Sequence, residues 1–108
     1  MIHAEVTKYH TFATPGFIRE YGGTIPAAAV IAAVAPLLGA AGQEPSWIIG
    51  DPHTERPYTE DSGHTLRIPA PGARLGRRFY AVRDDHEAGC GCGCGGGAVI
   101  TFILPEEY

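Results

Sequence analysis

Three cysteines occur at every second position of the segment "DDHEAGCGCGCGGGAV", residues 84–99. Cys90, Cys92 and Cys94 alternate with glycine, and His86 stands four residues before the first cysteine. Thiolates are soft metal ligands, and glycine lets a backbone fold tightly enough for successive sulfur atoms to converge on one ion. A Cys3His site for zinc, or a two- or three-sulfur site for copper, is therefore one hypothesis for this segment.

The spacing of the cysteines differs from that of ordinary structural zinc sites, which pair two C-x2–4-C knuckles from separate segments. The chain has only three cysteines and no second knuckle. Under a different interpretation the cysteines are small packing residues between glycines. This interpretation, without a cofactor, is the one we favour.

Thiol redox chemistry is a third interpretation of the same cysteines. A disulfide between two thiols would leave the third free for exchange or for a bond between subunits. However, the carboxylates of Asp84, Asp85 and Glu87 would raise the thiol pKa, and only Arg83 or His86 could oppose them. A reactive thiolate is therefore not the favoured interpretation.

Other catalytic patterns are missing from the sequence. Ser46 and Ser62 are the only serines, and neither lies in a G-x-S-x-G motif. The glycine tract lacks the Gly-Lys-Ser/Thr ending of a phosphate-binding loop, and a predicted strand follows it rather than a helix. Four ionisable residues of one polar region match no site and are interpreted as surface residues: His53, Glu55, Asp61 and His64. We therefore expect a protein that is not an enzyme.

The charge balance argues against a nucleic-acid-binding protein. The formal net charge is -4, and a dedicated nucleic-acid binder would carry a basic face. Five basic residues nevertheless lie within a short stretch: Arg67, Arg74, Arg77, Arg78 and Arg83. We interpret this stretch as a surface that neighbouring carboxylates balance, although it could also contact an acidic partner.

The longest apolar stretch is "IPAAAVIAAVAPLLGAA", residues 25–41. It is rich in alanine, contains Pro36 and is short for a bilayer crossing of about twenty residues, so it predicts a buried helix and no membrane association. The start "MIHAEVTKYH" has neither the basic residues nor the apolar run of a secretory signal. Cytoplasmic synthesis with reduced cysteines is the expected setting.

The local patterns predict a small α+β fold, a single domain over residues 1–108. Alternation or β-branched composition predicts about five short strands: 2–13, 46–50, 64–68, 77–82 and 98–104. A helix capped by Thr24 is expected from Pro26 to Ala35, because Pro36 cannot continue the hydrogen-bond ladder. At Pro36 the helix either ends or kinks into a short second piece through Leu37 and Leu38 to Gly39. Residues 51–63 are expected to be an exposed loop. A mainly antiparallel sheet with one apolar, alanine-rich helix follows from this order.

These elements place the cysteine segment in a hairpin loop between the last two strands. At about fourteen residues it is longer than the usual two to five, and loops of that length tend to be functional or disordered. The predicted helix is apolar on nearly all sides, so a sheet or neighbouring subunits must cover most of it.

Our first functional hypothesis is a non-enzymatic assembly protein that binds protein partners, as a homo-oligomer or as a subunit of a larger particle such as a bacteriophage virion. The alternative is a metal-binding or thiol-redox module that uses Cys90, Cys92, Cys94 and His86. A third possibility is an inhibitor or accessory protein that acts through the acidic residues of 51–61.

Overall fold

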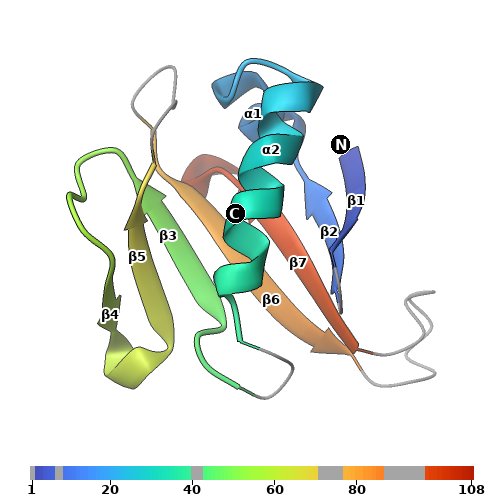
Figure 1. Cartoon of the computed structure of the whole chain (residues 1–108). Coiled ribbons are helices and arrows are strands. Elements are labelled where there is room, and N and C mark those ends of the chain that lie inside the picture. Colours follow the sequence, from blue (N-terminus) through green and yellow to red (C-terminus); the bar gives the residue numbers. More distant parts are fainter. Residues whose placement is uncertain (1, 7–8, 40–42, 71–76, 87–96) are drawn as a thin grey trace.

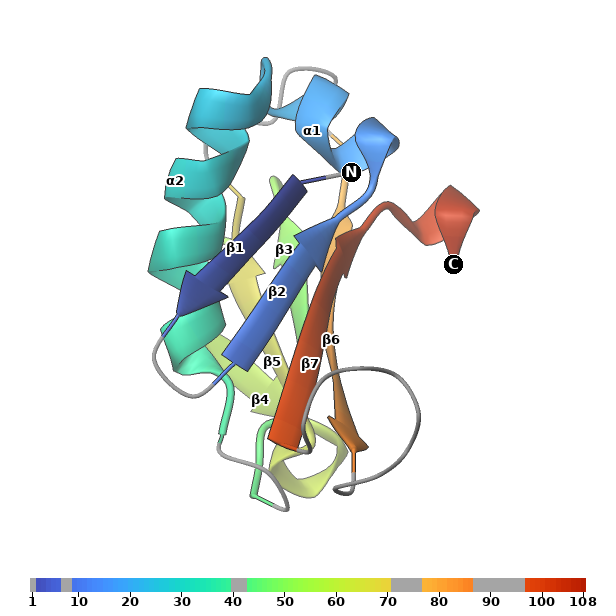
Figure 2. The same cartoon turned by 90° about the vertical axis from the view of Figure 1, so that its right-hand side faces the viewer.

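The computed structural model describes residues 2–6, 9–39, 43–70, 77–86 and 97–108. The chain forms one α+β domain in which a single sheet carries helices on one side (Figures 1 and 2). Within the described residues the sheet has seven strands, in the spatial order β1-β2-β7-β6-β3-β5-β4. The strands are β1 (Ile2–Val6), β2 (Tyr9–Ala13), β3 (Trp47–Asp51), β4 (Tyr58–Glu60), β5 (Thr65–Pro69), β6 (Phe79–His86) and β7 (Gly97–Ile103).

The sheet is mixed, which corrects the prediction of a mainly antiparallel sheet. Strands β2 and β7 pair in parallel, as do β3 and β5, while the other neighbours pair antiparallel. Each parallel pair joins strands that do not follow one another in the chain. Helical segments and four strands separate β2 from β7, and the edge strand β4 separates β3 from β5. A long connection allows the second strand to run in the same direction as the first. Local sequence patterns do not reveal this direction.

The strand count also exceeds the predicted five. The expected first strand, residues 2–13, is an antiparallel hairpin of β1 and β2, with Val6 opposite Tyr9. The expected loop, residues 51–63, contains the edge strand β4 and a short 3-10 turn, η2 (Asp61–Gly63). The other four predicted strands are confirmed, with boundaries that shift by up to four residues.

Two α-helices connect β2 to β3. Helix α1 (Pro15–Glu20) was not predicted from the sequence. The Thr14 side chain caps it by accepting a hydrogen bond from the backbone N–H of Phe17 at 3.3 Å. Helix α2 (Thr24–Val34) confirms the predicted helix. It begins two residues earlier than expected, and Gly23 occupies the cap position in place of Thr24.

Both ends of α2 follow from particular residues. Gly23 has φ of +124°, a conformation that favours glycine, so the chain can turn sharply between the helices. Pro36 lies in the short 3-10 segment η1 (Ala35–Leu37), which follows the last turn of α2. The expected end of the α-helix at Pro36 is thereby confirmed, because proline has no N–H to donate.

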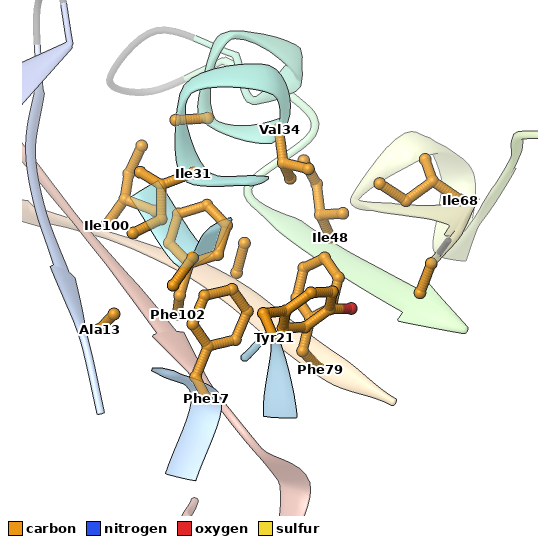
Figure 3. Close-up of a cluster of buried hydrophobic side chains, with 14 of the residues drawn as sticks. Ala13, Phe17, Tyr21, Ile31, Val34, Ile48, Ile68, Phe79, Ile100 and Phe102 are labelled. Atoms are coloured by element: carbon orange, nitrogen blue, oxygen red, sulfur yellow. The ribbon is translucent and has the colours of Figure 1, made fainter. Parts of the chain in front are cut away.

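The core lies between the helices and one face of the sheet (Figure 3). The ring of Phe17 in α1 packs edge-to-face on Phe79 of β6 and at a tilt against Phe102 of β7, with ring centroids 5.4 and 5.3 Å apart. Ile31 of α2 packs into the same cluster, beside Ile100. A third 3-10 turn, η3 (Pro105–Glu107), follows β7, and Glu107 there accepts a hydrogen bond of 2.6 Å from the Thr14 hydroxyl. The C-terminal turn is thus fastened to the start of α1.

Helix α2 is covered on one side only, which corrects the expectation of a buried helix. Ala27, Ile31 and Val34 face the sheet and are buried. The opposite side of the helix is exposed. Among the described residues there is no helix with the length and apolar character that a membrane crossing requires.

Candidate assembly surfaces

The cysteine segment lies outside the described residues. Cys90, Cys92 and Cys94 belong to residues 87–96, and the backbone of His86 ends β6 opposite Gly97. The predicted hairpin is confirmed, because β6 and β7 pair antiparallel on either side of this segment. No cluster of potential metal ligands occurs among the described residues. The zinc and copper hypotheses therefore remain predictions from the sequence.

The basic stretch is largely neutralised, as the sequence interpretation expected. Arg67 donates to Glu60 at 2.7 Å and to Asp51 at 3.1 Å across β3, β4 and β5. The hydrogen bond to Glu60 raises the pKa of Arg67 above its ordinary value, and partial burial opposes this effect. Arg67 therefore acts as a cross-strand tie.

Two further arginines of the stretch also have partners. Arg77 donates to Glu106 at 2.9 Å and lies beside the buried carboxylate of Glu20. Arg83 is buried, and its Nη1 atom donates to the carbonyl oxygens of Gly39 at 2.7 Å and Gln43 at 2.5 Å. Arg74 lies outside the described residues. In the part of the chain that the structure describes, only Arg78 of this stretch keeps an exposed, unpaired guanidinium.

An open hollow of about 450 Å³ lies beside these charges, at the end of the sheet where β3 stops and β6 begins. It is lined by Asp51, His53, Arg77, Arg78, Pro105 and Glu106. Asp51 and Glu106 already accept from arginines, and the lining residues that the structure describes include no serine, threonine or cysteine that could act as a nucleophile. The hollow therefore holds charge pairs rather than a recognisable catalytic set.

The polar residues of 53–64 do not form one site. His53 follows the end of β3, where its backbone N–H donates to Asp51. His64 precedes β5, where its Nδ1 atom contacts Glu44. Because β3 and β5 are parallel, these positions lie at opposite ends of the strand pair. Their interpretation as separate surface residues agrees with the structure.

The outer helix face is the exposed side of α2 and η1. It comprises Ile25, Pro26, Ala29, Ala32, Ala33, Pro36 and Leu37, all of which are exposed. Residues 24–38 contain no ionisable side chain. Ile25 is 84% exposed and Leu37 is 46% exposed, so the two largest apolar side chains of this face belong to the large exposed hydrophobic residues among those described.

The open sheet face is the side of the sheet that the α-helices leave uncovered (Figure 2). Side chains alternate along each strand, so the residues between the core positions point to this side. Val82 among them is buried, and the other six are half-buried. It comprises Phe12, Trp47, Ile49, Tyr80, Val82, Thr101 and Ile103. Adjacent strands place these residues in two rows, one running from Phe12 through Thr101 and Val82 to Trp47, the other from Ile103 through Tyr80 to Ile49.

Aromatic rings gather at one part of the open sheet face. The rings of Trp47 and Tyr80 lie 5.4 Å apart in an edge-to-face contact. Tyr108 reaches back from the C-terminus to both rings, at 5.3 and 6.0 Å, and is itself 70% exposed. Aromatic side chains with an apolar body and a polar end are enriched at protein interfaces.

Comparison with known proteins adds no further guide, since the chain matches no family model, no curated protein and no solved structure. Sequence reasoning had singled out the apolar helix but had missed the open sheet face. The sequence contained part of the evidence for this face, because "WIIGD" and "AVITFI" place large apolar residues on both sides of a strand. A strand with apolar residues on both sides is expected to be covered on both sides.

Proposed function

We propose that this protein is a non-enzymatic assembly subunit that associates with further copies of itself, as part of a larger particle such as a bacteriophage virion. The observation that carries the proposal is the outer helix face. A helix at the surface of a monomeric domain ordinarily carries charged or polar residues toward water. Here no ionisable group occurs from residue 24 to residue 38.

The apolar residues of the outer helix face are informative because they are exposed and adjacent to one another. Scattered apolar residues are normal at a protein surface, whereas a continuous apolar patch indicates an interaction site. The exposed positions Ile25, Ala29, Ala32 and Pro36 follow one another at intervals of three or four residues, so they form one stripe along the helix. The stripe is continuous with Leu37 at the end of η1.

Size-exclusion chromatography with light scattering tests the proposal over a range of protein concentrations. We expect masses above the 11.4 kDa of one chain, rising with concentration toward a limiting species. A double substitution, A29E/A33E, should lower the measured mass, because it introduces two charges on the outer helix face. The matched control is R56E, which changes the charge by the same amount at an exposed loop position and should leave the mass unchanged.

A monomer at all concentrations, in wild type and variants alike, would overturn the proposal of self-assembly. Circular dichroism and thermal melting must accompany each measurement, because only a folded variant reports on the interface. Alanine and glutamate both favour helix, so A29E/A33E should keep its fold.

A further inference from the structure

We propose that the open hollow at one end of the sheet binds the phosphate group of a small phosphorylated molecule, with Arg78 as the main contact. This hollow of about 450 Å³ lies between the end of β3 and the start of β6. Its lining shares no residue with the outer helix face or the open sheet face, so binding there does not depend on assembly.

The first argument is the place of the hollow in the sheet. Strands β3 and β7 run in the same direction, because both are antiparallel to β6 between them, and each has a parallel neighbour, β5 and β2. The carboxyl ends of these four strands therefore lie at one edge of the sheet, where β6 begins (Figure 1). In open α/β sheets, ligands bind outside the carboxyl ends of the strands. The hollow has this position, since Asp51 ends β3 and the lining residues Pro105 and Glu106 follow β7.

The second argument is which charges of the lining are already paired. Asp51 accepts from Arg67 at 3.1 Å, and Glu106 accepts from Arg77 at 2.9 Å. Arg78 is exposed, and its guanidinium has no hydrogen-bond or ion-pair partner among the residues that the structure describes. The charge that remains for a ligand to neutralise is therefore positive, which favours an anionic ligand over a cationic one.

The third argument is the arrangement of the two arginines. Arg77 and Arg78 are adjacent in the sequence, and both line the hollow. Successive side chains of a strand point to opposite faces, but these two residues precede β6, which begins at Phe79. Arg77 is also held in place, because its backbone N–H donates to the buried carboxylate of Glu20 at 3.4 Å and its Nη1 atom donates to Glu106. A side chain that is already fixed loses less conformational entropy when it binds a ligand.

The donors of the lining fit a phosphate group better than a carboxylate. His53 adds an exposed imidazole, so three nitrogen-bearing side chains line the hollow: His53, Arg77 and Arg78. A phosphate group offers three acceptor oxygens and up to about two negative charges, whereas both oxygens of a carboxylate can be satisfied by one guanidinium. A volume of about 450 Å³ is within the range of sites for small organic ligands. We therefore expect a phosphate monoester rather than inorganic phosphate alone.

Titrations followed by nuclear magnetic resonance test the proposal with two probes, inorganic phosphate and phenyl phosphate. Each probe is added to the full-length, 15N-labelled protein at constant ionic strength, because a change of salt concentration alone alters the interactions of surface charges. We expect saturable shifts at the backbone amides of Asp51, His53, Arg78 and Glu106. Phenyl phosphate should bind more tightly than inorganic phosphate, and acetate, the carboxylate for comparison, should bind more weakly.

Two substitutions that each remove one charge should have opposite effects. Arg78→Gln should weaken the binding of phenyl phosphate by about tenfold, because a hydrogen bond from a charged donor is lost. Glu106→Gln should strengthen it, because this carboxylate competes with the ligand for Arg77. Arg19→Gln is the matched control and should leave the dissociation constant unchanged, since Arg19 is exposed but does not line this hollow.

Melting curves in phosphate-free buffer show whether each variant is folded. Arg78→Lys provides a second variant at the same position, which keeps the charge but not the planar guanidinium and should bind with intermediate affinity. Shifts that do not saturate, or equal binding by the wild type and Arg78→Gln, would overturn the proposal. Equal affinities for acetate and inorganic phosphate would overturn the assignment of a phosphate ligand, and a failure of phenyl phosphate to bind more tightly would overturn that of a monoester. The proposed self-assembly is tested separately by chromatography.

Discussion

The aromatic ring of Phe79 lies directly over Gly50 of the neighbouring strand. The two residues are opposite each other in the antiparallel pair of β3 and β6, and both are buried. A Cβ atom at position 50 would stand 2.0 Å from Cε1 of Phe79. The ring cannot move away easily, because it also contacts Tyr21 and Phe102, with centroids 5.8 and 6.0 Å away.

Gly50→Ala should therefore destabilise the domain by about 1–3 kcal/mol, the usual cost of overpacking a core. Chemical denaturation of both proteins measures the difference. In the F79L background G50A should lower the free energy of unfolding by less than it does in the wild type, because leucine leaves space above position 50. The comparison is between G50A/F79L and F79L alone. Equal effects of G50A in the two backgrounds would show that the ring is not the cause.

Arg83 should be important for stability rather than for binding. It is 8% exposed and holds the carbonyl groups that follow η1. Arg83→Met should lower the free energy of unfolding by about 1–3 kcal/mol, because it removes the charged donor of two partly buried hydrogen bonds to carbonyl oxygens. Arg78→Met is the matched control, since Arg78 is exposed, and its effect should be within about 0.5 kcal/mol. Similar melting temperatures for the two variants would contradict the assignment.

Tyr21 should make the domain sensitive to alkali. Burial, followed by the charge of Glu20, raises the pKa of Tyr21 far above its ordinary value. Above about pH 10 the unfolded chain ionises this phenol while the folded chain does not, so stability falls as the pH rises, by up to about 1.4 kcal/mol per pH unit. Tyr21→Phe should remove this part of the fall.

At neutral pH the same substitution should do little harm. The buried hydroxyl of Tyr21 has no hydrogen-bond partner among the residues that the structure describes. Its removal should change stability by no more than about 1 kcal/mol and in the stabilising direction. Urea denaturation of both proteins at pH 7 and at pH 10.5 measures both effects. A wild-type protein that loses no more stability than Tyr21→Phe between these pH values would contradict the prediction.

The three cysteines should be dispensable for the fold if they are small packing residues. Replacing Cys90, Cys92 and Cys94 with serine should shift the melting temperature only slightly and should leave assembly intact. The metal hypothesis predicts loss of a stoichiometric zinc or copper ion and a large drop in stability. Elemental analysis of protein purified without added metal, together with thiol titration, separates these outcomes.

Glycine substitutions provide the matched control within the same segment. Alanine at Gly91 and Gly93 should cost more than serine at the cysteines, because positions that need positive φ cannot accept a side chain without strain. The metal hypothesis expects the reverse order. A cysteine-free protein that no longer folds would therefore favour the metal hypothesis.

The local sequence determined the main helix and most of the strands. Alanine content and the position of Pro36 predicted α2 and its end, because helix propensity and the missing proline N–H act over a few residues. The β-branched run at 98–104 predicted β7. The hairpin of β6 and β7 followed from the order of two strands with turn-forming residues between them.

Only the tertiary structure decided how these segments combine. The parallel pairing of β2 with β7 joins residues some ninety positions apart, and no local pattern encodes the direction of such a contact. The hydrogen bond between Thr14 and Glu107 could not be predicted for the same reason, because these residues are also far apart in the sequence. The apolar composition of α2 predicted that its surface needs cover, but the number of sides that the sheet covers depends on the layer arrangement. One side of the helix and one face of the sheet are left open because a domain of two layers has only one interior.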